Sequence, residues 1–301
     1  MLEGALSLPA LLTQGLLWGI LAMGVYLTFR VLHMVDLTVD GSLCTGGAVC
    51  AVLTLAGWNL WLALAAAVVA GLLAGLVTGV LHSFMGLPAV LAGLLTQQAL
   101  YAIQLQGLGE GLSVSATPLL SAPHEGSWLA VLPVLGLILG LIAALCWFFS
   151  TELGFGIRAT GANLAMSRAQ GIPTGLSRVL GLMLANALAA LAGALLCQFQ
   201  GAAEVDLGRG AFVAGLAALL LGETLLHRYF RAFGLRLLGA VVGAVVCCLC
   251  LGGLLRLGLN ANACKLLPAV LVALILAASH WKARHFRRAV KLPVGRGEPH
   301  A

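Results

Sequence analysis

The chain has 301 residues, of which 61% are apolar and only 9% are charged, whereas about 25% of the residues of a soluble domain are charged. Residues 41–109 contain no Asp, Glu, Lys or Arg at all. This composition excludes an ordinary soluble protein and predicts an all-α, polytopic helical membrane protein. The net charge of +6 comes from basic residues dispersed along the chain, which argues against nucleic acid as a partner.

About nine runs are apolar and long enough to be expected as membrane crossings. They cover residues 8–29, 43–58, 60–81, 87–106, 128–149, 179–199, 211–225, 237–255 and 265–281. Residues 1–4 lack the basic region of a cleavable signal peptide, so we expect the first run to remain as a crossing. These runs predict a membrane domain over residues 1–281, followed by a basic tail over 282–301.

Basic residues set the expected orientation, because Lys and Arg that flank a span stay in the cytoplasm. The tail is rich in both. With nine crossings and the tail inside, all basic residues except Arg209, Arg256 and Lys265 fall on the cytoplasmic side. We therefore expect a multi-pass protein of a cytoplasmic membrane, with its N-terminus outside and its C-terminus in the cytoplasm.

A polar segment, VDLTVDGS over residues 35–42, follows the first run. Polar residues at membrane depth are unfavourable and often functional, and a break containing glycine lets the backbone leave the helix where protein or a water-filled cavity covers it. One interpretation is that the segment lines a solute pathway through Asp36, Thr38, Asp40 and Ser42. Alternatively, Asp40 or Ser42 caps the next helix, or the two acids hold Na⁺ or relay protons.

Other polar and small residues inside the runs have simpler interpretations. Gln97 and Gln98 lie in the fourth run, where interhelical hydrogen bonding competes with contact to a solute. Gly71, Gly75 and Gly79 lie four residues apart, which predicts close helix packing. The eight cysteines lie in or beside apolar runs and lack histidine partners, so we expect neither a metal site nor a redox motif among them.

The longest connector expected inside the cell covers residues 150–178. Asn163 or Thr160 can start a short helix there, and Gly171 followed by Pro173 ends it. A helix of about two turns is too short to be stable alone in water, so we expect it to dock on another protein. The sequence has no GxxxxGK[ST] phosphate loop, which excludes nucleotide hydrolysis of that kind by this chain.

Three stretches occur in a characteristic order: VDLTVDGS, then TELGFGIRATGANLAMSRAQGI leading into GLMLANALAALAGALLCQFQG, then AGLAALLLGET. Together they resemble the membrane-spanning permease subunits of ATP-binding-cassette (ABC) importers of the branched-chain amino acid and ribose class. The resemblance covers about residues 12–281. Asp40 stands directly before Gly41, and no extra N-terminal crossing of the sugar-type members is present. Both features look closer to an amino-acid-like subgroup.

The resemblance implies a type II importer-like permease fold in a bacterial cytoplasmic membrane. The chain would then form the translocation path of an importer for amino acids or a related small polar solute. Similar permeases form dimers, here expected to be homodimers, that bind ATPase subunits inside and receive solute from an extracytoplasmic binding protein. ATP and Mg²⁺ would be bound by the ATPase chain, so this chain is expected to be no enzyme and to need no cofactor.

The resemblance also assigns a role to the short inner helix. Within residues 160–171 it corresponds to the coupling helix that docks into the ATPase. The residues expected to form or shape that contact are Arg158, Thr160, Asn163, Met166, Arg168 and Gly171.

Two functions of other classes remain as alternatives. An ion-coupled secondary transporter would use Asp36 and Asp40, but such folds often repeat an interrupted helix in both halves, and VDLTVDGS occurs once. An intramembrane enzyme would need a nucleophile and a base within reach, for which Ser42 with His33 is the one loose candidate.

Overall fold

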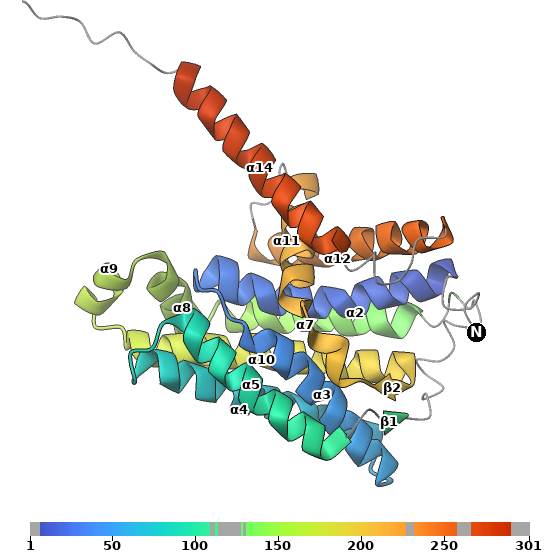
Figure 1. Cartoon of the computed structure of the whole chain (residues 1–301). Coiled ribbons are helices and arrows are strands. Elements are labelled where there is room, and N and C mark those ends of the chain that lie inside the picture. The colour runs from blue at the N-terminus through green and yellow to red at the C-terminus, as the bar shows by residue number, and fades with distance from the viewer. Residues whose placement is uncertain are drawn as a thin grey trace, which may run out of the picture.

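The computed structural model describes residues 7–108, 112–113, 128, 131–226, 232–257 and 266–289. This part of the chain is a bundle of helices with one short pair of strands (Figure 1). Each of the nine predicted apolar runs overlaps a helix. Within the described ranges, seven helices are long and apolar enough to cross a membrane. The predicted polytopic all-α fold is therefore confirmed.

The first predicted run ends in an irregular helix and a non-helical connector. α2 covers Leu8–Tyr26 and continues as a π-helix, η1, over Leu27–Val31. Residues 32–37, which we call the break, are non-helical, and α3 covers Thr38–Leu55. The break overlaps the first part of the polar segment, whereas Gly41 lies inside α3, where it packs against the backbone of Gln97.

Three helices form the centre of the bundle: α3, α4 over Leu60–Ser83 and α10 over Thr174–Gln200. Glycines bring their backbones into contact. A Cβ on Gly46 of α3 would clash with the carbonyl of Ala190, and one on Gly193 of α10 would clash with the carbonyl of Leu43. Gly71 and Gly75 of α4 meet α10 in the same way, which confirms the predicted close packing.

The remaining long helices surround this centre. They are α5 over Ala89–Leu108, α7 over Val131–Phe148, α11 over Ala211–Leu226, α12 over Phe233–Arg256 and α14 over Leu266–Ala289. α5 packs on α3, whereas α11 and α12 pack on α2 and on each other. α14 contacts α11 and then extends away from the bundle (Figure 1).

The two ends of the bundle carry different short elements (Figure 1). Two short helices lie at one end, which we call the α9 end: α8 over Glu152–Ala162 and α9 over Leu164–Ala169. The strands β1 (Leu112–Ser113) and β2 (Ala202–Ala203) pair antiparallel at the opposite end, and the 3-10 helix η4 follows over Val205–Gly208. The start of α2 also lies away from the α9 end. This agrees with the chain crossing the bundle an odd number of times between the start of α2 and the start of α8.

Candidate functional site

The break carries the backbone from the α9 end back to the middle of the bundle. Its start lies beside α8, because a Cβ on Gly161 would clash with the carbonyl of Val31. Its end lies beside Asn186, near the middle of the 27-residue helix α10. His33 has a φ of 55°, a left-handed conformation that non-glycine residues seldom adopt. Such irregular backbone is tolerated at membrane depth where the protein itself surrounds it.

Asp36, in the break, is buried and its carboxylate is fully engaged. One oxygen accepts the backbone N–H of Thr38 at 2.9 Å, and the other accepts the side-chain N–H of Asn186 at 2.7 Å. Asp36 is 1% exposed and Asn186 is 0% exposed. The two donors stabilise a carboxylate that would otherwise be highly unfavourable inside the bundle.

Two further hydroxyls extend this network. Ser42 donates to the side-chain oxygen of Asn186 at 2.7 Å, and Thr38 lies 2.8 Å from the hydroxyl of Thr78 on α4. All of these side chains are buried. The structure therefore brings Asp36, Thr38 and Ser42 together in one sealed cluster, which we call the Asp36 network, and it does not place them on an open surface of this copy.

The predicted capping role of Asp40 or Ser42 at its own helix is wrong. The first residue before α3 is Leu37, and the N-terminal amide of Thr38 is satisfied by Asp36 instead. Asp40 lies one turn further along, where its carboxylate points to a different helix. It accepts the backbone N–H groups of Phe212 at 2.7 Å and of Gly210 at 3.2 Å, and so it caps the N-terminus of α11.

An open pocket of about 130 Å³ lies between α3, α5 and the segment before α11. Three of the predicted pathway residues line it: Asp40, Gln97 and Gln98. The other lining residues are Gly41, Cys44, Tyr101, Gln104, Gly208 and Arg209. The pocket thus combines one carboxylate, one guanidinium, three side-chain amides and a phenol, groups that can hydrogen-bond a small polar molecule.

Tyr101, Gln104 and Cys44 were not identified as candidates from the sequence. Tyr101 and Gln104 follow Gln97 by four and seven residues, so helical periodicity would have placed all three on one face of α5. Gln104 donates to the carbonyl of Gly41 and to the hydroxyl of Thr45, at 2.9 and 2.7 Å. These bonds join α5 to α3 along the pocket wall.

The short helix expected in the inner connector is present as α9. Asn163 begins it by accepting the backbone N–H of Met166 at 3.0 Å, and Gly171, with a φ of 76°, ends the turn that follows. Of the two predicted starts, Asn163 is therefore correct. Met166 is 62% exposed, and Arg168 is exposed with its guanidinium 3.4 Å from the hydroxyl of Thr174.

The two remaining coupling candidates lie in α8, which the sequence analysis did not identify as a separate helix. Thr160 is buried and donates to the carbonyl of Gly156 at 2.7 Å. Arg158 is exposed and lies over the rings of Phe155 and Phe233. Thus α8 connects α9 to the bundle, and both helices present exposed side chains at this end.

Metal-binding clusters are absent from the described part of the chain, where no three His, Cys, Asp or Glu residues gather closely enough to hold an ion. Six cysteines there are free thiols, at positions 50, 146, 197, 247, 248 and 250, whereas Cys264 lies outside the described residues.

Comparison with known proteins assigns the chain to a family. Residues 7–279 match the family model described as the permease component of a branched-chain amino acid transport system. The chain belongs to this permease family. The resemblance inferred from VDLTVDGS and the two later stretches is therefore confirmed, as is the broad conclusion that the chain is a multi-pass membrane permease of the ABC class.

Relatives of the permease are named for the transport of different solutes. A tyrosine transport system permease protein of Clostridioides difficile is 32% identical over 273 residues, covering 90% of both chains. The autoinducer 2 import system permease protein LsrC of Escherichia coli is 31% identical over 243 residues, covering 75% of this chain and 64% of LsrC. Among solved structures, PsaBC from Streptococcus pneumoniae in complex with Fab matches 78% of the permease at 16% identity with a TM-score of 0.41.

Proposed function

We propose that this permease forms the solute path of an ATP-driven, binding-protein-dependent importer, and that the solute passes the pocket at Asp40. The observation that carries the proposal is the composition of this pocket. It gathers Asp40, Arg209 and the glutamines of α5 at a broken crossing inside an apolar bundle. Polar groups of this kind inside a membrane domain mark solute pathways.

A second copy of the chain completes the path in this proposal. Gln98 and Gln106 are exposed on α5, beside exposed apolar residues such as Leu94 and Leu95. α5 lies between α4 and α7 in the chain and is 20 residues long. It is nevertheless less apolar than the seven helices that could span a membrane in the described part of the chain. Because lipid cannot hydrogen-bond glutamine side chains, this face of α5 favours a protein neighbour.

ATPase subunits contact α9 in this proposal. The exposed Met166 and Arg168 provide an apolar and a cationic contact at the end of the bundle. α8 directly precedes α9 in the chain, and its Gly161 packs against the backbone of Val31 where the break begins. A displacement of α9 can therefore reach the break through a continuous series of packed elements. ATP and Mg²⁺ are bound by the ATPase, and the permease needs no cofactor of its own.

The proposed solute is an amino acid or a related small polar molecule, delivered by an extracytoplasmic binding protein. The tyrosine-transport relative supports this class, and the pocket offers opposite charges from Asp40 and Arg209. We place the α9 end in the cytoplasm of a bacterium and the strand end outside, because the basic residues predict that orientation.

An ion-coupled mechanism through Asp36 and Asp40 is the less favoured alternative. Both carboxylates already accept two N–H groups each, and neither belongs to a cluster of three potential ligands among the described residues. A Na⁺ ion needs oxygen atoms that are not already aimed at donors.

The test is uptake by proteoliposomes that contain the permease with its proposed ATPase and binding-protein partners. We expect radiolabelled amino acids, with tyrosine tested first, to accumulate only with ATP on the ATPase side. Accumulation by the permease alone, driven by a Na⁺ or H⁺ gradient without ATP, would refute the proposal.

The coupling contact has a matched control in the same assay. Met166→Asp should lower solute-stimulated ATP hydrolysis about tenfold, which corresponds to about 1.4 kcal/mol. Met85→Asp should not, although Met85 is 68% exposed and follows Phe84, which packs beside Gly175 at the same end. Equal effects of the two substitutions would remove α9 as the docking element.

A further inference from the structure

α11 is held by charged side chains at both of its ends, and these side chains lie on opposite sides of the break. Asp40, shortly after the break, accepts backbone N–H groups at the start of α11. Arg30, shortly before the break, forms an ion pair with Glu223 near the end of α11. The 16-residue helix is about 24 Å long. It therefore bridges the two parts of the chain that the break separates.

The contact at the start of α11 belongs to the pocket wall. Asp40 engages Gly210 and Phe212, while the backbone N–H of Gly208 lies 2.9 Å from the sulfur of Cys44. Asp40, Cys44 and Gly208 all line the pocket. A shift of the first turn of α11 therefore changes the pocket directly.

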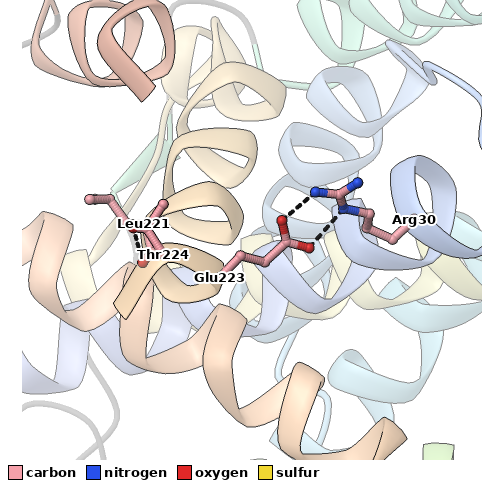
Figure 2. A network of polar contacts seen from close by, with 4 residues as sticks. All are labelled: Arg30, Leu221, Glu223 and Thr224. Atoms are coloured by element: carbon pink, nitrogen blue, oxygen red, sulfur yellow. Dashed lines mark hydrogen bonds and ion pairs between the residues drawn. The ribbon is translucent and has the colours of Figure 1, made fainter. Parts of the chain in front are cut away.

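The contact at the end of α11 is a two-bond ion pair (Figure 2). The Nε of Arg30 donates to one carboxylate oxygen of Glu223 at 2.7 Å, and a terminal nitrogen donates to the other oxygen. Paired bonds of this geometry fix the relative orientation of the two side chains. Arg30 lies in the π-helix η1, and such irregular turns are frequent at functional sites.

Close packing along α11 connects its two ends. A Cβ on Gly222 would clash with the carbonyl of Gly239 on α12, and a Cβ on Gly215 would lie 2.8 Å from the side chain of Val25 on α2. Glycines at both positions let α11 pack closely on its neighbours. Because the helix is continuous between these contacts, it moves as one piece.

We infer that Arg30 and Glu223 are positioning residues for the pocket. Through α11, their ion pair sets where Gly208 and Phe212 lie against Asp40 and Cys44, and opening the pair loosens the pocket wall. The inference that this ion pair affects solute binding rests on the proposed function of the pocket. The effect of the ion pair on the pocket wall concerns the permease alone and does not depend on that function.

Cys44 provides a native reporter of the pocket wall, because its side chain faces the pocket and the residue is 5% exposed. The full-length permease in lipid nanodiscs is treated with 2-aminoethyl methanethiosulfonate, and labelling of the peptide that contains Cys44 is followed by mass spectrometry. Glu223→Gln should raise the labelling rate at least about fivefold, the lower end of coupling between separate sites.

Glu152→Gln is the matched control, because it removes an exposed carboxylate at the same end, from the first turn of α8. It should label like the unmodified chain. The exchange Arg30→Glu with Glu223→Arg restores the pair with its charges reversed, and it should return the rate to within about twofold of the unmodified chain, because it restores the coupling. A loss of packing at either position alone would not be restored in this way.

Two results overturn the inference. One is an unchanged Cys44 labelling rate in Glu223→Gln, and the other is a raised rate that the charge exchange leaves raised. Thermal unfolding of each variant is recorded beside the labelling, and a raised rate that simply follows a lowered melting temperature counts against the inference. Failure of ATP-driven uptake would refute the proposed function but would not alter these labelling rates, so the two failures are distinguishable.

Discussion

Asp36 and Asp40 lie four residues apart in one polar segment, yet the structure gives them different surroundings. Asp36 is 1% exposed and bonds to Thr38 and Asn186 inside a sealed cluster. Asp40 lines an open pocket and holds the start of a neighbouring helix. The spacing places both near the start of α3, but the packing of α5, α10 and α11 decides which carboxylate faces the open pocket. Burial, and not residue type, therefore separates the acid of the sealed network from the acid of the pocket.

Asp36→Ala should have the largest effect on stability. It leaves one N–H of the Asn186 side chain and the backbone N–H of Thr38 without their acceptor inside the bundle, and each buried donor left unsatisfied destabilises by about 1–3 kcal/mol. Thermal unfolding of the purified variant, followed by size-exclusion chromatography, measures the change. A variant that unfolds like the unmodified permease but has lost transport would contradict the distinction between the two acids.

Asp40→Asn should have a smaller effect on stability and a larger one on transport. Asparagine keeps one acceptor for the start of α11, so the loss of capping should be about 0.5–1 kcal/mol. Removal of the charge from the pocket should lower solute-stimulated ATP hydrolysis about tenfold, or about 1.4 kcal/mol. Glu204→Gln is the control, since it removes an exposed carboxylate that lies in the segment before α11 and does not line the pocket. Loss of transport in both variants would point to surface charge instead of the pocket.

Ser42→Ala tests how far the Asp36 network depends on its outer members. It removes one donor to Asn186, and interhelical hydrogen bonds of this kind contribute about 0.6 kcal/mol on average. We expect a small drop in the melting temperature and normal uptake. A loss as large as that of Asp36→Ala would mean that the hydroxyl, and not the carboxylate, organises the cluster.

Gln98→Ala should have the smallest effect on stability, about 0.5 kcal/mol or less, as for an exposed position. Its effect should appear in the solute concentration that gives half-maximal uptake. Gln106→Ala on the same helix, outside the pocket, should leave that concentration unchanged. An equal change of that concentration in both variants would contradict a specific role of the pocket, because Gln106 does not line it.

Local signals in the sequence predicted local features well. Asn163 and Gly171 define α9 through a capping side chain and a left-handed glycine, both of which act within a few residues. The apolar runs likewise predicted each long helix, because the length of a crossing is set by the membrane. The glycine-rich α8 was missed, since its three glycines argue against a helix that packing nevertheless stabilises.

Partners that are distant in sequence could not be predicted. Nothing near Asp36 indicates that Asn186 will satisfy it, or that Asp40 will cap a helix that begins at Ala211. These contacts depend on how α3, α5, α10 and α11 pack, which one sequence does not specify. The pocket was predictable in part. Helical periodicity along α5 would have added Tyr101 and Gln104 to the predicted Gln97, whereas the residues that α3 and the segment before α11 contribute depend on packing.

The Asp36 network also constrains how the permease is made. The carboxylate of Asp36 and the amide of Asn186 are 150 residues apart, so the ribosome delivers the acid to the bilayer long before its partner exists. Until α10 inserts, the nascent chain carries a buried acid without its main donor, and water or the insertion machinery has to shelter it. Arrival of α10 is thus the step at which the half-made bundle becomes committed to its final arrangement.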